Sequence, residues 1–178
     1  SVGGNLTGSI DNVSVKEYTT SNIPRIDYTG GGCGSLLLEG QRTNLVTESQ
    51  DFSTWSSQNV TNGSNVTTSP DGTQNADTII DSAISTRHIN YESFSGNLAT
   101  ERTFSVYAKQ NSLRYLFLSV TNSGDSHCYS AIFDLQSGIV SATKVNGTAT
   151  NSASMISMGD GWYRCIISGT MTTATGSY

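Results

Sequence analysis

The feature of this sequence that most constrains its fold is a series of short strand-like runs between Asn44 and Gly169. The runs are rich in β-branched and aromatic residues and recur about every eight to twelve positions, with apolar and polar side chains alternating. They are Val60–Thr68, Asp77–Ile80, Arg87–Phe94, Thr103–Lys109, Arg114–Thr121, His127–Asp134, Ile139–Lys144, Ser154–Met158 and Trp162–Gly169. Turn residues separate them: Pro70-Asp71-Gly72, Ser123-Gly124-Asp125, Gln136-Ser137-Gly138, Asn146-Gly147 and Gly159-Asp160-Gly161. Because no stretch keeps a helical apolar period, the sequence predicts an all-β fold, a β-sandwich or jelly roll.

Two of the middle runs indicate which side chains are buried. One face carries small and apolar residues: Phe104, Val106 and Ala108 in the first run, and Leu116, Leu118 and Val120 in the second. The opposite face carries Tyr107 in the first run, and Leu113, Tyr115 and Phe117 in the second. Since side chains alternate across a strand, these strands are either covered on both faces or present an aromatic platform to solvent.

The first 43 residues are organised differently. Ser9–Tyr18 alternates as a half-buried strand does, whereas residues 19–43 contain Pro24 and Gly30-Gly31-Gly32 and have no period. We therefore predict three segments. Residues 1–18 form the terminal strand of a preceding module or a strand that completes the sandwich. Residues 19–43 form an extended linker or arm, and residues 44–178 form a β-sandwich module.

Charge and hydropathy narrow the classes of partner. The formal net charge is -5, and only nine Lys and Arg residues are scattered along the chain. Nucleic-acid binding requires a basic stripe that these residues do not form, so we expect no nucleic-acid partner. No run approaches the apolar length of a membrane span, so we expect no membrane insertion. The chain begins at Ser1, which predicts a processed product or a piece of a longer protein.

The three cysteines are Cys33, Cys128 and Cys165, too few for a disulfide framework. Cys128 and Cys165 both lie in strand-like runs. We expect buried free thiols, because cysteine packs well as a small hydrophobe, and a Cys128–Cys165 bridge is the alternative.

The sequence has few residues that would support catalysis. It has two histidines, His88 and His127, and no motif typical of a hydrolase nucleophile, a zinc peptidase or a phosphate-binding loop. Carboxylates are available for glycoside hydrolysis, but most of them stand next to turns, where acidic residues are ordinary. We therefore expect a non-catalytic protein.

Several segments resemble the CBM4/9-like group of carbohydrate-binding jelly-roll modules. They are NLVTESQDFSTW at residues 44–55, FSVYAK at 104–109, and the later segments YLFLSV, SAIFDLQSG and GDGWYRCIISGT. The preceding segment PRIDYTGGGCGSLLLEGQRTNL is similar to the connector before such modules in bacteriophage tail and fibre proteins. The resemblance spans roughly residues 24–178. It implies a jelly roll, carbohydrate binding, and a place in a virion or outside the cell.

Sugar-binding sites combine aromatic rings with planar polar groups, and these residue types coincide on three successive runs. Tyr107, Tyr115, His127 and Tyr129 are all odd-numbered, and Arg114 lies at the rim of the face that they would share. If the three strands are neighbours, the five residues form a carbohydrate-binding face. The alternative is that the rings belong to the core.

The resemblance also implies a structural Ca²⁺ held by oxygens of the first loop and an Asp on the closing strand. Glu48 and Asp51 match the loop, and Asp11 is the matching carboxylate. Carboxylate oxygens are the ligands that Ca²⁺ prefers. A hydrogen bond from Trp55 or from a turn amide to Asp11 is the alternative.

The order of the segments departs from that of the resembling modules. Ser9–Tyr18 resembles the closing strand of such a module but stands at the front, and the final strands are missing after Tyr178. We therefore expect the vacant strand position to be filled by the N-terminal strand or by a neighbouring chain. The expected function is a non-catalytic phage tail or fibre module that binds host surface glycan and neighbouring subunits. One alternative is a purely architectural, subunit-docking sandwich; another is a domain of a polysaccharide-degrading enzyme.

Overall fold

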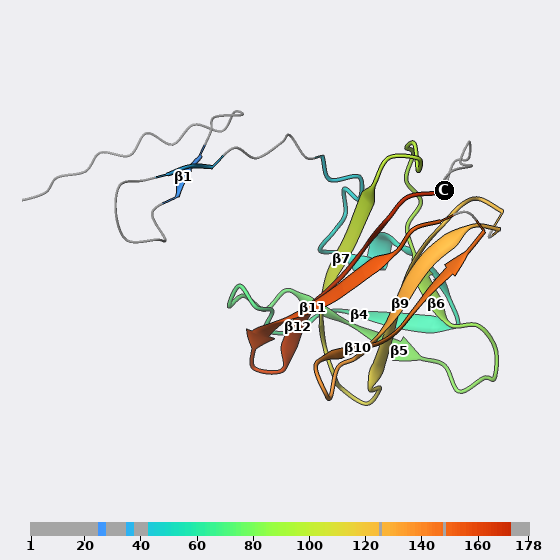
Figure 1. Cartoon of the computed structure of the whole chain (residues 1–178). Coiled ribbons are helices and arrows are strands. Elements are labelled where there is room, and N and C mark those ends of the chain that lie inside the picture. The colour runs from blue at the N-terminus through green and yellow to red at the C-terminus, as the bar shows by residue number, and fades with distance from the viewer. Residues whose placement is uncertain (1–24, 28–34, 38–42, 125, 148, 172–178) are drawn as a thin grey trace, which may run out of the picture. The chain divides into compact units, whose positions relative to one another are not determined.

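A computed structural model describes residues 25–27, 35–37, 43–124, 126–147 and 149–171 (Figure 1). The chain divides into two compact units, residues 1–43 and residues 44–178. In the first unit, β1 (Arg25–Asp27) pairs antiparallel with β2 (Ser35–Leu37), and Ile26 lies opposite Leu36. This short ladder lies within the stretch predicted as an extended arm, where the lack of periodicity gave no signal for it. The predicted strand Ser9–Tyr18 lies outside the described residues.

The second unit is built from strands and one short 3₁₀ turn. Its elements are η1 (Phe52–Thr54), β3 (Ser56–Gln58), β4 (Val60–Thr67), β5 (Ala76–Asp81), β6 (Ile89–Tyr91), β7 (Arg102–Lys109), β8 (Tyr115–Thr121), β9 (Cys128–Asp134), β10 (Ile139–Asn146), β11 (Ser152–Gly159) and β12 (Trp162–Gly169). All of its strand pairs are antiparallel. Within the described residues, no helix has the length and apolar character needed to cross a membrane.

The centre of this unit is a sandwich of two three-stranded sheets, ordered β10-β9-β8 and β11-β12-β7. β10 and β11 contact each other along one side of the sandwich. On the other side, β7 and β8 each have one strand partner among the described residues. The two-stranded sheets β3-β6 and β4-β5 complete the unit (Figure 1). The strand predicted to fill the vacant position lies outside the described residues, so its partner stays a prediction.

One hydrophobic core lies between the two three-stranded sheets. β9 contributes Tyr129 and Phe133, and β12 contributes Cys165 and Ile167, all fully buried. Burial removes each of these side chains from water, which contributes about 1.5–3 kcal/mol for a large apolar side chain. Cys128 and Cys165 are both free thiols, as expected, but only Cys165 is buried, whereas Cys128 is half-buried. Burial raises the pKa of the Cys165 thiol to about 11, so this thiol is protonated at neutral pH.

The all-β sandwich predicted from the alternating runs is confirmed. Trp162–Gly169 is a strand over the predicted range, and seven of the other predicted runs match a strand to within a residue or two at each end, β4, β5, β7, β8, β9, β10 and β11. β6 is shorter than the predicted Arg87–Phe94, because Phe94 leaves the ladder and packs against the core. β3 was not predicted, since Ser56–Gln58 has no apolar residue to reveal an alternation. Glycines with positive φ lie at four of the predicted turns: Gly72, Gly138, Gly147, and the pair Gly159 and Gly161.

Candidate functional site

Four apolar side chains lie exposed on the outward face of sheet β10-β9-β8, which we call the aromatic face. They are Tyr115 and Phe117 of β8, Ile132 of β9 and Ile139 of β10, with exposed fractions of 56%, 60%, 37% and 55%. The strand register places these side chains close together. Phe117 pairs with Ile132 across β8 and β9, and Asp134 of β9 pairs with Tyr115 on one side and with Ile139 on the other. Exposed apolar residues are ordinary when scattered, but a contiguous group on a flat sheet is a candidate binding surface.

The alternation of β8 explains why its aromatic side chains face water. Leu118 and Val120 are buried and point into the sandwich, so Tyr115 and Phe117, which differ from them by an odd number of residues, point outward. A shift of one residue in register would exchange the two sets of side chains. The buried leucine and valine therefore fix the outward position of both rings.

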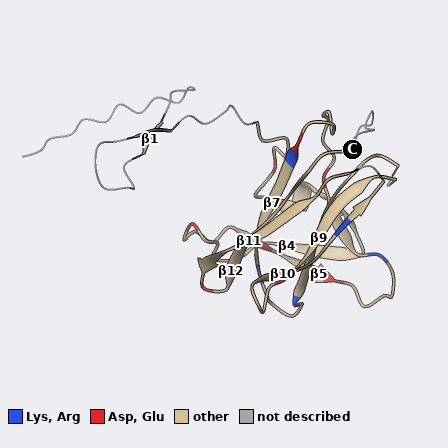
Figure 2. Ribbon diagram, viewed as in Figure 1, with Lys and Arg blue, Asp and Glu red and all other residues tan. Residues whose placement is uncertain are grey.

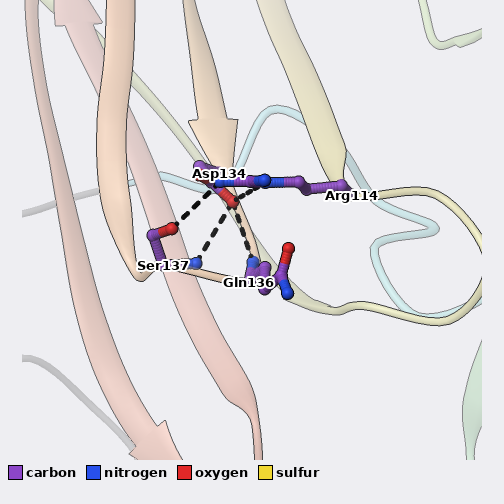
Figure 3. A network of polar contacts seen from close by, with 4 residues as sticks. All are labelled: Arg114, Asp134, Gln136 and Ser137. Carbon is purple, nitrogen blue, oxygen red and sulfur yellow. Dashed lines mark hydrogen bonds and ion pairs between the residues drawn. The ribbon is translucent and has the colours of Figure 1, made fainter.

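Arg114 and Asp134 form the polar border of the aromatic face (Figure 3). Arg114 Nε donates to Asp134 Oδ1 at 2.8 Å, and Arg114 Nη2 donates to Asp134 Oδ2 and to Ser137 Oγ, the latter at 3.1 Å. Asp134 Oδ1 also accepts from the backbone amides of Gln136 and Ser137, at 3.0 and 3.1 Å. One carboxylate thus closes the β9–β10 turn and holds the guanidinium in a two-point contact.

This network determines the ionisation states of Asp134 and Arg114. Arg114, together with Ser137 and the turn amides, holds the pKa of Asp134 well below its usual range. The Asp134 carboxylate in turn raises the pKa of Arg114. Both groups are ionised at neutral pH and their charges cancel. The Arg114 side chain keeps 43% of its surface exposed, whereas that of Asp134 keeps 3%.

Arg114 also positions the adjacent ring. Its guanidinium carbon lies 5.2 Å from the centre of the Tyr115 ring, within the range of a cation–π contact. A guanidinium held by Asp134 and stacked on Tyr115 has little freedom of its own. The arrangement therefore presents an aromatic ring and a planar hydrogen-bond donor side by side in a fixed geometry.

Tyr129 does not lie on this face, so the prediction that five residues share one face is wrong. Tyr129 is fully buried in the core, and its hydroxyl donates to the Arg102 carbonyl oxygen at 3.0 Å. Burial raises the pKa of Tyr129 well above its usual range. The physical reason is register. Odd-numbered residues of β8 pair with even-numbered residues of β9, as Tyr115 with Asp134, and even-numbered residues of β8 pair with odd-numbered ones, as buried Val120 with Tyr129.

Tyr107 and His127 also lie away from Tyr115. Tyr107 is exposed on the outward face of the other three-stranded sheet, where it pairs with Arg164. His127 precedes β9, half-buried, and its Nδ1 lies 3.1 Å from Ser126 Oγ. Its ring covers Gly147, where an added Cβ would come within 2.2 Å of the imidazole. Of the predicted residues, the structure brings together only Arg114 and Tyr115.

The structure adds residues to the face that sequence reasoning did not place there. Phe117 is not one of them, because alternation already placed it on the same strand face as Tyr115. Ile132, Ile139 and Asp134 join the face through strand register, which no local pattern reveals. Ser137 is placed by the turn that Asp134 closes.

Of the three predicted calcium ligands, Glu48 and Asp51 lie within the described residues and Asp11 lies outside them. Asp51 caps η1, and its Oδ1 accepts from the amide and hydroxyl of Ser53 at 2.9 and 2.5 Å, which lowers the pKa of Asp51. The Glu48 carbonyl oxygen accepts from Trp55 Nε1 at 3.0 Å. In the described part of the chain, no three His, Cys, Asp or Glu residues gather closely enough to hold a metal ion. The calcium site stays a prediction that depends on Asp11.

The arrangement nearest to a catalytic one lies at the end of β5 and in the loop that follows it. His88 Nδ1 lies 2.6 Å from Asp81 Oδ1, and His88 Nε2 lies 3.5 Å from Ser82 Oγ, at the limit of a hydrogen bond. The Ser82 amide, a natural donor to an oxyanion, is already bound to the Asn59 carbonyl oxygen at 3.1 Å. We assign these three side chains to closing the loop between β5 and β6.

Comparison of the sequence with protein-family models finds no match, and comparison with curated proteins finds none either.

Proposed function

We propose that this chain is a non-catalytic carbohydrate-binding module, a jelly roll of the CBM4/9-like kind in a bacteriophage tail or fibre, and that it binds host glycan on the aromatic face. The observation that carries the binding proposal is the exposure of Tyr115 and Phe117 beside the fixed guanidinium of Arg114. The resemblance of the sequence segments supports the jelly roll and the phage setting.

The chemistry of the face suits a pyranose ring. The C–H side of a sugar packs against aromatic faces, and two rings on alternate positions of one strand offer neighbouring contacts. Arg114 has five N–H donors, and its three hydrogen bonds to Asp134 and Ser137 use only some of them. The remaining donors and the Ser137 hydroxyl are available to sugar hydroxyls.

The charge pairing selects the class of sugar. Because Asp134 neutralises Arg114, the part of the aromatic face around Tyr115 offers hydrogen bonds without an unpaired cation. Lys144, the other cation of this face, lies opposite Ser130, two rows of the ladder away from Tyr115. A neutral glycan fits this surface better than an acidic one. A shallow, open face gives modest affinity per site, and many copies along a fibre would raise the effective affinity through local concentration.

A second function is favoured by the aliphatic part of the same face. Ile132 and Ile139 extend the apolar strip away from the rings, and apolar surface of this kind packs against protein neighbours. The architectural alternative is that a neighbouring subunit covers the whole strip. In that case Phe117→Ser would weaken assembly and leave no glycan binding to lose.

A glycan array probed with the purified protein and two variants tests the proposal. Tyr115→Ala removes a ring from the aromatic face and is expected to lower the affinity for neutral glycans at least tenfold, about 1.4 kcal/mol. Tyr91→Ala is the matched control, because Tyr91 is 47% exposed on β6 and lies outside the aromatic face. Failure of the unmodified protein to bind any neutral glycan, or equal binding by both variants, contradicts the proposal.

A further inference from the structure

The outward face of the other sheet, β11-β12-β7, has a different composition, and we call it the serine face. Register and alternation place eleven side chains on it: Thr103, Ser105, Tyr107, Lys109, Ser152, Ser154, Ile156, Trp162, Arg164, Ile166 and Ser168. Five of the eleven are Ser or Thr, and the large apolar side chains that are substantially exposed are Tyr107 at 47% and Ile156 at 49%. This face therefore offers many hydroxyl groups and little apolar surface.

The charges of the serine face are unbalanced. Its two charged positions are Lys109 and Arg164, both exposed and both cationic. Lys109 pairs with Trp162 while Arg164 pairs with Tyr107, so Lys109 and Arg164 are diagonal neighbours, a relation in which Cα atoms lie about 7–8 Å apart. Among the described residues neither forms an ion pair. Elsewhere basic residues stand singly along the ribbon (Figure 2).

Contacts within the face fix Arg164 without neutralising it. Its guanidinium carbon lies 5.9 Å from the centre of the Tyr107 ring, and Nη2 donates to Ser105 Oγ at 3.3 Å. Thr103 Oγ1 and Ser168 Oγ lie 2.7 Å apart on the same face. A ring, a held guanidinium, a nearby ammonium and rows of hydroxyls are thus assembled on one face of a sheet.

We propose that the serine face is a second binding site, for acidic polysaccharide whose sugars carry carboxylate or sulfate groups. Arg164 and Lys109 would form charge-assisted hydrogen bonds to these groups, and the hydroxyl rows would bind sugar hydroxyls. The chain carries a net charge of -5, but Lys109 and Arg164, which form no ion pair with any described residue, place two positive charges together on one face, and this makes the face complementary to an anion. A protein partner is the poorer match, because stable protein interfaces need more exposed apolar surface at their centre. This site does not depend on glycan binding by the aromatic face.

Biolayer interferometry on immobilised polymers tests the site. The probes are polygalacturonate for carboxylate, dextran sulfate for sulfate, unmodified dextran for neutral sugar and polyglutamate for negative charge without sugar. Binding to at least one acidic polysaccharide is expected, stronger than to dextran or polyglutamate, and weaker at high salt because the cations are exposed. Comparison of the first two probes shows which acidic group the face takes.

Three single-charge variants assign the binding to the serine face. Arg164→Gln and Lys109→Gln are each expected to lower the affinity at least fivefold, whereas Lys144→Gln removes one charge from β10, in the other sheet, and is expected to change it less than twofold. All three positions are exposed, so the fold should persist, and a thermal melt of each variant checks this. Absence of binding to both acidic polysaccharides, equal binding of polyglutamate, or equal losses in all three variants overturns the proposal.

Discussion

The two outward faces of the sandwich cover the same core but differ in how their charges are paired. On each face an arginine lies over a tyrosine ring, Arg114 over Tyr115 and Arg164 over Tyr107. On the aromatic face the carboxylate of Asp134 holds the guanidinium at two points. On the serine face no carboxylate among the described residues does so. A single acidic residue therefore separates the neutral surroundings of Tyr115 from the cationic surroundings of Tyr107.

The turns beside the two faces explain where this difference comes from. In the β9–β10 turn, the Asp134 carboxylate accepts hydrogen bonds from the backbone amides of Gln136 and Ser137. The turn therefore holds a carboxylate within reach of Arg114. The β11–β12 turn is made by positive φ angles at Gly159, Asp160 and Gly161, of 87°, 50° and 78°. This second turn also contains a carboxylate, Asp160, but among the described residues Asp160 forms no ion pair with Arg164. The pairing of Arg114 with Asp134, and the lack of such a pair for Arg164 among the described residues, set the class of ligand proposed for each face.

The largest expected effect comes from breaking the core that both faces share. Phe133 is fully buried, and Phe133→Ala should lower the free energy of unfolding by about 3–5 kcal/mol through lost burial and the cavity that remains. Phe117→Ala makes the same chemical change at a side chain that is 60% exposed, and should change stability by less than about 0.5 kcal/mol. Urea denaturation measures both. Equal losses would mean that the two faces of β8 and β9 are assigned wrongly.

The next largest effect is expected from a substitution that gives the aromatic face an affinity for acidic polysaccharide. Asp134→Asn removes the carboxylate and leaves Arg114 as an unpaired cation on the aromatic face. We expect this variant to be less stable than the parent protein and to gain affinity for acidic polysaccharide, about fivefold, as measured by interferometry on polygalacturonate or dextran sulfate. The gain should persist when Arg164→Gln is added, because it arises on the other face. No gain would show that charge pairing does not distinguish the faces.

The smallest expected effect is a difference in acid stability. Because the pKa of Asp134 is lower in the folded state than its unfolded value of about 3.9, its contribution to stability is present above that value. The contribution is lost as the pH falls through the depressed folded pKa. Melting temperatures measured from pH 7 down to pH 2 should therefore fall less steeply below about pH 4 in Asp134→Asn than in the parent. Asp71, whose pKa is also lowered by Ser69 and Thr73, contributes equally in both proteins.

Local patterns in the sequence predicted the elements but not how they meet. Alternation assigned Leu118 inward and Phe117 outward correctly, since both lie on one strand. Odd numbering marks the outward residues of β8 but not those of β9, because the numbering of the residues that share a face depends on the cross-strand register. Tyr129 is in the core for that reason. The pairing of Arg114 with Asp134, across twenty positions of sequence, follows from the same register and had no local signal.

The measurement that tests the central claim most directly is a solution NMR titration that follows the assigned ring signals of Tyr115 and Tyr107 in one sample. A neutral oligosaccharide that binds in the glycan array is expected to shift the Tyr115 signals and leave those of Tyr107 in place. An acidic oligosaccharide is expected to do the reverse. Signals of both rings that move together with either sugar, or that move with neither, would contradict a division of the sandwich into two faces with different ligands.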